Sequence, residues 1–130
     1  MPHTATHITQ LGRIFVPVSN QDKALAFYTE TLGFEKRVDI SYGEGERWIE
    51  VVPGGGEAAL ALVPPREGQP LEPSSNVSLE TDDIEAAHSE LEQRGVEVED
   101  IMRFDPPVPP MFAFKDPDGN SYMLVQREDG

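Results

Sequence analysis

The fold is decided by residues 13–34, which read RIFVPVSNQDKALAFYTETLGF. The first part of this stretch alternates apolar side chains with other residues, which is the two-residue period of a β-strand: Ile14, Val16 and Val18. The second part repeats apolar residues at positions i, i+3 and i+7, which is typical of one helix face: Leu25, Tyr28 and Leu32. The stretch therefore predicts a strand followed by a helix.

Residues that begin and end helices bound the second part of this stretch. Ser19 with Asp22 resembles a capping box, and Asn20 is a second candidate for the N-cap. Gly33 fits the left-handed position that ends many helices. Because Phe34 begins a further apolar segment to residue 40, we expect a strand–helix–strand unit.

The second half of the chain repeats this pattern. Residues 77–81 alternate like a strand, Asp82 can cap a following helix, and Gly95 can end it. From Asp82 to Gly95 is thirteen positions, and from Asn20 to Gly33 is also thirteen. This matched spacing predicts an internal repeat.

Further strands complete both units, at residues 47–52 and 58–63 in the first and at residues 96–101, 111–114 and 121–126 in the second. We therefore expect an α+β protein made of two βαβββ modules. Residues 1–130 are expected to form a single domain, with module 1 at about 10–63 and module 2 at about 75–127. The proline-rich residues 64–73 are the predicted linker.

The composition narrows the possible partners. The chain has 24 acidic and 10 basic residues, which gives a formal net charge of −14. That charge repels phosphate backbones and anionic lipids, so we expect neither nucleic-acid nor membrane binding. It favours a cationic ligand in a cleft, or it simply keeps the protein soluble. With no cysteine, no signal-peptide pattern and no long apolar run, the expected location is cytoplasmic.

Three segments together resemble the vicinal-oxygen-chelate superfamily: ALAFYTETLGFE at 24–35, LETDDIEAA at 79–87 and KDPDGNSYMLVQ at 115–126. That superfamily includes glyoxalase I, extradiol dioxygenases, fosfomycin-resistance enzymes and bleomycin-resistance proteins. The resemblance implies that the two modules form a cup-shaped mixed sheet. It also implies a homodimer whose clefts contain residues from both chains.

The resemblance implies metal ligands at four strand positions in those members that use a metal. In this chain the four positions hold Arg13, Ala61, Asn76 and Met123. A cation, a methyl group, an amide and a thioether do not suit Zn, Ni, Mn or Fe. Nor do the histidines, at His3, His7 and His88, suggest another ligand set. We therefore expect no metal and no cofactor.

A cup without metal offers a small-molecule site. Strand alternation places Arg13 and Phe15 on one face, and Trp48 and Glu50 share a face that either lines the cup or is solvated. Arg13 either holds a carboxylate or phenolate of a ligand or pairs with an acidic residue. The predicted ligand-binding residues are Arg13, Phe15, Trp48, Glu50, Asn76, Ser78 and Met123.

Three functions are compatible with this reading. The first is a metal-free protein that binds an aromatic or cationic compound in a dimer-associated cleft. The second is a metal-dependent lyase, isomerase or dioxygenase, and the third is a regulatory partner with a vestigial cup. The sequence points to no catalytic residue, so whether the protein is an enzyme stays open. Residues 104–110 are either a lid over the cup or a rigid connector.

Overall fold

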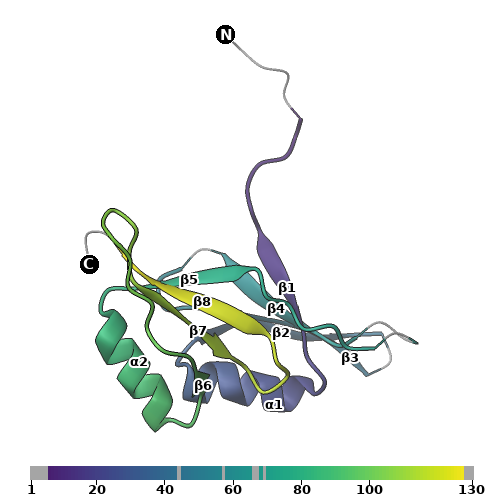
Figure 1. The fold of residues 1–130 in the computed structure, drawn as a ribbon. Helices are drawn as coiled ribbons and strands as arrows, with labels where there is room; N and C mark the ends of the chain where they lie inside the picture. Colours follow the sequence, from purple (N-terminus) through teal and green to yellow (C-terminus); the bar gives the residue numbers. More distant parts are fainter. Residues whose placement is uncertain (1–5, 44, 57, 66–67, 69, 128–130) are drawn as a thin grey trace.

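The chain folds into two four-stranded sheets with helices packed against them (Figure 1). The structure is a computed structural model that describes residues 6–43, 45–56, 58–65, 68 and 70–127. Part of the predicted linker, at residues 66–67 and 69, lies outside the described residues, as does His3.

Module 1 contains the first sheet. Its elements are β1 (Arg13–Pro17), α1 (Gln21–Ala26), η1 (Phe27–Thr31), β2 (Glu35–Tyr42), β3 (Glu46–Val52) and β4 (Ala59–Val63). The strand order is β1-β4-β3-β2, with β1 parallel to β4 and the other pairs antiparallel. The parallel pair requires a long crossover, which α1, η1, β2 and β3 provide.

Module 2 repeats this arrangement. Its elements are β5 (Val77–Thr81), α2 (Ile84–Gln93), β6 (Glu97–Val98), β7 (Met111–Lys115) and β8 (Ser121–Gln126). The strand order β5-β8-β7-β6, with β5 parallel to β8, matches that of module 1. The predicted α+β fold of two βαβββ modules is therefore confirmed. The strand predicted at 96–101 is shorter, because after Val98 only Glu99 and Met102 still bond to β7.

One of the two helix caps differs from the prediction by one residue, while the other is the predicted candidate Asn20. Asn20 caps α1, since its Oδ1 accepts a hydrogen bond from the Lys23 amide at 3.0 Å. In α2 the cap is Asp83, whose Oδ1 accepts from the Ala86 amide at 3.0 Å, so the prediction of Asp82 was wrong. The distance from cap to glycine is therefore thirteen positions in module 1 but twelve in module 2.

The extra residue of module 1 is absorbed in η1, which is a π-helical turn. The Leu32 amide donates to the carbonyl of Phe27, five positions earlier, at 3.0 Å. In α2 the corresponding Arg94 amide donates to the carbonyl of Glu90, four positions earlier. Since a π-turn uses five-residue steps in place of four, it lets the longer segment reach the same stop.

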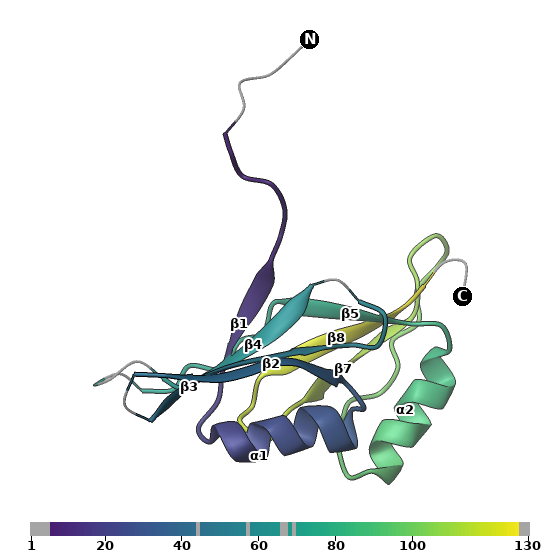
Figure 2. The same ribbon diagram turned by 180° about the vertical axis from the view of Figure 1, so that it is seen from behind.

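Both modules contribute to one hydrophobic core. Figures 1 and 2 show both helices on the same side of the two sheets. Buried side chains from this side of each sheet pack together with Tyr28 of η1, and the largest of them are Val16, Ile49, Leu62, Phe112 and Tyr122. The two modules thus bury their helix-facing surfaces against each other and leave the opposite sheet faces free.

A buried polar network joins the modules within this core. The Tyr28 hydroxyl donates to Asp116 at 2.7 Å and lies 2.5 Å from the Tyr122 hydroxyl. Burial raises the pKa of both tyrosines, and the Asp116 carboxylate raises the pKa further. Asn120, fully buried, donates to the Pro17 carbonyl and accepts from the Ser74 amide, each at 2.8 Å. The Asp-Pro-Asp-Gly-Asn segment is therefore a structural link between modules.

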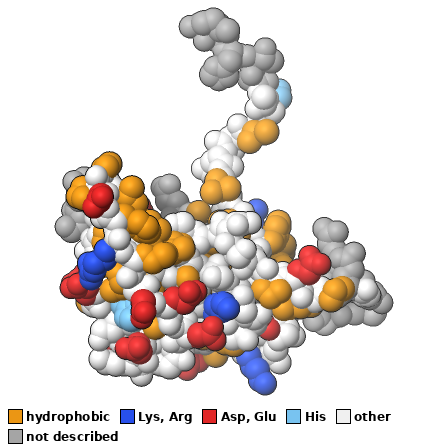
Figure 3. Space-filling view, in the orientation of Figure 1, with side chains coloured by type: hydrophobic (Ala, Val, Ile, Leu, Met, Phe, Trp, Pro, Cys, Tyr) orange, Lys and Arg blue, Asp and Glu red, His pale blue; other side chains and the backbone are white. Residues whose placement is uncertain are grey.

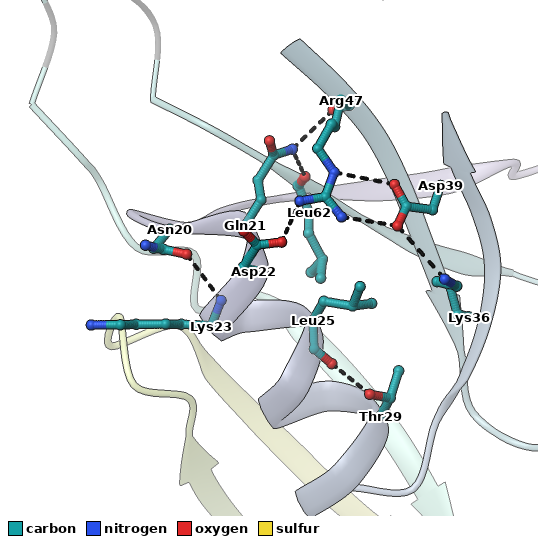
Figure 4. A network of polar contacts seen from close by, with 10 residues as sticks. All are labelled: Asn20, Gln21, Asp22, Lys23, Leu25, Thr29, Lys36, Asp39, Arg47 and Leu62. Atoms are coloured by element: carbon teal, nitrogen blue, oxygen red, sulfur yellow. Dashed lines mark hydrogen bonds and ion pairs between the residues drawn. The ribbon is translucent and has the colours of Figure 1, made fainter. Parts of the chain in front are cut away.

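A second set of polar contacts fastens α1 to the sheet of module 1 (Figure 4). The Arg47 guanidinium of β3 bonds to Asp39 of β2 and to Asp22 of α1. The hydrogen bonds from Arg47 hold the pKa of Asp39 below its usual range. Gln21 donates to the carbonyls of Arg47 and Leu62, so the first turn of α1 is held over two strands.

Candidate functional site

The sheet of module 1 has one face free of helices, which we call cup face 1. Strand alternation sends Val16 and Ile49 into the core, and it sends their neighbours to the opposite side. On β1 and β3 this opposite side carries Arg13, Phe15, Trp48 and Glu50. The prediction left two faces open for Glu50, and the structure places it on cup face 1.

Glu50 is the centre of this face. Its side chain is buried, with the residue only 3% exposed, yet it carries a carboxylate. That carboxylate accepts hydrogen bonds from Arg13 Nε at 2.8 Å, Trp48 Nε1 at 2.7 Å and Arg37 at 2.6 Å. Its cross-strand partner on β4 is Ala61, whose small side chain leaves room for the charged groups. A buried carboxylate with this many donors is well compensated.

Arg37 reaches the site because β2 has a bulge. Lys36 pairs with Val51 and Val38 pairs with Glu50, so Arg37 is an extra residue between two regular pairs. A bulge of this kind redirects a side chain that would otherwise follow the alternation of the strand. Sequence reasoning missed Arg37, because no turn or glycine signal marks the bulge in the segment EKRVDI.

Burial and hydrogen bonding act in opposite directions on Glu50. Burial alone would raise the pKa of the Glu50 carboxyl. The hydrogen bonds from Arg37, Trp48 and Arg13 outweigh burial and hold the pKa below its ordinary value. Glu50 is therefore ionised at neutral pH and is paired with Arg13 and Arg37. The carboxylate and the two guanidinium groups together carry a net charge of +1.

Aromatic side chains flank this charged cluster. Phe15 and Trp48 meet edge to face, with ring centroids 6.0 Å apart. The Arg13 guanidinium lies 5.8 Å from the centroid of Trp48, within range of a cation–π interaction. Phe15 is 56% exposed, and the terminal nitrogens of Arg13 make no hydrogen bond to any described residue. Cup face 1 thus presents an aromatic surface beside unused hydrogen-bond donors.

A groove continues from Phe15 along the linker. It encloses about 560 Å³ and is lined by Phe15, Pro17, Val63 and the prolines at 64, 65 and 70, with Leu71 and Glu72. Apolar walls of this size suit the body of a drug-sized molecule.

The remaining predicted site residues lie on module 2. Ser78 of β5 and Met123 of β8 are register partners, and Asn76 directly precedes β5. Asn76 and Ser78 are exposed and Met123 is half-buried, on the face of this sheet opposite the core. Among the described residues, no hydrogen bond or ring contact joins these three to the Glu50 cluster. The structure therefore brings together four of the seven predicted residues and keeps three apart.

Two of the positions at which the resemblance implies metal ligands, Arg13 and Ala61, do not fit a metal here. Arg13 is ion-paired with Glu50, and Ala61 is buried without a donor atom. His88 contacts the Glu99 carbonyl at 2.9 Å and packs on Phe112, while His7 is exposed. Within the described part of the chain, no three His, Asp or Glu side chains gather as a metal site.

The loop at residues 104–110, predicted as either a lid or a rigid connector, belongs to module 2, whereas cup face 1 lies on module 1. Residues 103–110 lead into the start of β7, where Met102 pairs with Met111. Figure 3 shows a hydrophobic patch over this loop, and its exposed members are Met102, Phe104 and Val108. In the described residues, no helix is long and apolar enough to cross a membrane.

Two modules with parallel strand pairs, open sheet faces and a charged aromatic cluster define a class of duplicated βαβββ proteins. The chain belongs to the Glyoxalase/Bleomycin resistance protein/Dioxygenase superfamily, whose family model matches residues 7–124.

Several relatives are similar over nearly the whole chain. TnmS3, an antibiotic binding protein from Streptomyces sp. CB03234, is 35% identical; the match covers 95% of this chain and 100% of that one, with a TM-score of 0.83. A superfamily member from Sphaerobacter thermophilus DSM 20745 is also 35% identical, covering 92% and 98%, with a TM-score of 0.84. The uncharacterized protein YetH of Bacillus subtilis (strain 168) is 32% identical over 92% of this chain and 99% of its own length.

Proposed function

We propose that the protein is a metal-free binding protein that holds an aromatic small molecule, of the antibiotic type, against cup face 1. The aromatic body would lie on Phe15 and Trp48 and extend into the linker groove. An acidic group of the ligand would accept from Arg13. The proposal includes a cytoplasmic location, because a binding protein protects a cell only in the compartment where the compound acts.

The Glu50 cluster is the observation that carries this proposal. It places two arginines and a tryptophan around a committed carboxylate, where a metal-dependent relative would need free donor atoms. Because Glu50 is already neutralised, the cluster favours an aromatic ligand with a phenolate or carboxylate over a cationic one. The similarity to the antibiotic binding protein TnmS3 supports the same class of function.

We also propose that the working form is a homodimer. Phe15 and Ile40 are exposed on cup face 1, and Ile8 and Leu11 are exposed on an N-terminal arm that projects from the body (Figure 1). Exposed apolar side chains in such number mark an interaction surface. A second copy would cover cup face 1 with its module 2, which would bring Asn76, Ser78 and Met123 to the cleft.

Ligand binding is tested by the fluorescence of Trp48, which is the single tryptophan of the chain. The protein is titrated with aromatic antibiotics sorted into acidic, neutral and cationic groups. We expect saturable quenching, strongest for acidic compounds. Arg13→Ala should weaken the binding of acidic compounds by about tenfold, a size typical for loss of a charged hydrogen bond. Arg103→Ala, an exposed arginine of module 2, is the matched control and should leave binding unchanged.

Two further measurements decide between the alternatives. Elemental mass spectrometry of untagged protein, purified without chelator, should find far less than one metal per chain. About one equivalent of a single metal would overturn the proposal and direct assays to lyase, isomerase and dioxygenase reactions.

Sedimentation velocity should give twice the 14.4 kDa chain mass, and Leu11→Ser should shift the measured mass toward that of a monomer. A monomer at all concentrations would contradict the dimer.

A further inference from the structure

Arg13 is held in the Glu50 cluster by one of its nitrogens. Arg13 Nε donates to Glu50 Oε2 at 2.8 Å, and its side chain is partly exposed on cup face 1. No described residue accepts a hydrogen bond from Nη1 or Nη2 of Arg13. These two nitrogens form the outer edge of the guanidinium, where two parallel N–H groups match the two oxygens of a carboxylate. We call this edge the Arg13 fork.

Glu50 orients the fork and cannot itself bind a ligand. Its Oε2 accepts from Arg13 and Trp48, and its Oε1 accepts from Arg37 Nε at 3.2 Å and Nη2 at 2.6 Å. An ionised carboxylate has about four acceptor sites, so both oxygens are fully used. Because β4 lies between β1 and β3, Arg13 reaches Glu50 across β4, where Ala61 leaves room. The bond from Nε then fixes the direction of the guanidinium.

Arg37 makes the charge of Arg13 available to a ligand. One arginine paired with Glu50 would be a neutral pair, and an anion beside it would be repelled by the carboxylate as well as attracted by the guanidinium. Arg37 comes from the bulge of β2, on the other side of β3 from Arg13. It compensates the charge of Glu50 from that side. Arg13 therefore keeps a net attraction for an anion.

The aromatic side chains place a ring beside the fork. The Arg13 guanidinium lies 5.8 Å from the centroid of Trp48, and the exposed Phe15 follows two positions along β1 on the same face. Residues two positions apart on a strand are separated by about 7 Å, so a ring on Phe15 brings a directly attached group to Arg13. A carboxylate there accepts from both nitrogens of the fork. A phenolate has a single oxygen and cannot match both donors.

We infer that the acidic group of the ligand is a carboxylate attached to its aromatic ring, bound by the Arg13 fork, and that Arg37 supports this contact through Glu50. The inference rests on the proposed function, which leaves the acidic group open between a carboxylate and a phenolate. Selection between these two groups comes from the number and direction of the donors, since both groups carry the same charge.

Three probes with one aromatic body separate carboxylate recognition from charge. They are 6-cyano-2-naphthoate, 6-cyano-2-naphtholate and 6-cyano-2-naphthamide. At a pH above the pKa of the naphthol, they are a two-oxygen anion, a one-oxygen anion and a neutral amide. Isothermal calorimetry should show about tenfold tighter binding of the naphthoate than of the naphtholate, the size of one charged hydrogen bond. Equal or reversed affinities would overturn the inference alone, whereas no binding of any probe would overturn the proposed function with it.

Arg13→Lys tests the fork because it keeps the positive charge and removes the two parallel donors. The ratio of naphthoate to naphtholate affinity should fall from about ten to about one. The affinity for the naphthamide should change little. A ratio that stays near the wild-type value would overturn the role of the fork.

Arg37 is tested by a pair of variants at one position. Arg37→Ala should weaken naphthoate binding about three- to tenfold relative to naphthamide binding, because Glu50 then opposes the anion. Arg37→Lys should restore most of that loss. Lys36→Ala is the matched control, since it removes a charge of the same strand that pairs with Asp39, and it should change neither affinity. Wild-type affinities in Arg37→Ala would overturn the role of Arg37, and Arg13→Lys tests the fork even if Arg37→Ala fails to fold.

Discussion

Glu50 is a charged residue that is buried although it lies on the sheet face opposite the core. Its carboxylate is stable there because Arg13, Arg37 and Trp48 all donate to it. Strand alternation predicted that Arg13, Phe15, Trp48 and Glu50 could share a face. It could not predict Arg37, since the bulge that turns this side chain inward depends on how β2 pairs with β3.

Replacing Glu50 should destabilise the fold. In Glu50→Gln the amide places a donor against arginine donors and leaves two positive charges without a partner. We expect the free energy of unfolding to fall by about 1–3 kcal/mol, less than for a fully buried pair because Arg13 and Arg37 are partly exposed. Urea unfolding measures this, with Glu46→Gln on the same strand expected within about 0.5 kcal/mol of wild type. Equal effects of the two variants would contradict the role of Glu50.

The stability of the protein should depend on pH through the same carboxylates. Glu50 and Asp39 both have a lowered pKa in the folded state. For Asp39 the main cause is the hydrogen bonding from Arg47. For Glu50 burial alone would raise the pKa, and hydrogen bonds from Arg37, Trp48 and Arg13 outweigh it. The contribution of the two carboxylates is complete above the unfolded pKa of about 4 to 4.5 and is lost as the pH falls through the folded pKa. Urea midpoints measured from pH 7 to pH 3 should decline below about pH 4.5. The decline should be shallower in Glu50→Gln.

Tyr28 tests the buried network between modules. Tyr28→Phe removes a hydroxyl that donates to Asp116 and contacts Tyr122, so the carboxylate loses a donor in the core. We expect a loss of about 1–3 kcal/mol in the free energy of unfolding. Tyr42→Phe, at an exposed tyrosine, is the control and should cost less than about 0.5 kcal/mol. A Tyr28→Phe protein as stable as the control would mean that the network is not stabilising.

At the scale of elements, the sequence predicts most of the strands and both helices, because each has a clear apolar period. Boundaries are less certain where two capping residues are adjacent, as at Ser19 and Asn20 or at Asp82 and Asp83. The π-turn could not be predicted, since a single extra residue leaves the apolar spacing of Leu25, Tyr28 and Leu32 nearly unchanged. The strand predicted at 96–101 was too long, because regular pairing ends at Val98 and Asp100 breaks the apolar alternation of Val96 and Val98.

The capping assignment leads to a direct comparison. Asn20→Ala should lower the free energy of unfolding by about 1 kcal/mol, because the Lys23 amide loses its acceptor. Ser19→Ala, one residue earlier, should have almost no effect, since Ser19 does not cap α1. Thermal unfolding followed by circular dichroism measures both. A larger effect at Ser19 would show that the helix begins one residue earlier in solution.

At the scale of the molecule, the sequence indicates two modules but not how they meet. Apolar alternation identifies two sheet faces without saying which face packs against the other module. The structure shows that the helix-facing surfaces share one core and that the opposite faces are open. The predicted site residues are therefore divided between Arg13, Phe15, Trp48 and Glu50 on one module and Asn76, Ser78 and Met123 on the other.

We infer from the shared core that residues 1–130 form one domain, and we expect a single unfolding transition. Trp48 fluorescence reports on module 1, and far-ultraviolet circular dichroism reports on both modules. The two probes should give the same urea midpoint, as expected for a cooperative domain of this size. Two separate midpoints would mean that each module unfolds independently and that the buried network does not couple them.

The buried network has a further consequence for the rate of folding. The bond from Asn120 to Pro17 joins residues 103 positions apart, and Tyr28 meets Tyr122 across 94 positions. Contacts that close such long loops must form against a large loss of chain entropy before they are stabilised by packing. The protein should therefore fold over milliseconds to seconds, well behind helical proteins of its length. The bonds that unite the two modules are thus the ones that make the native state slow to appear.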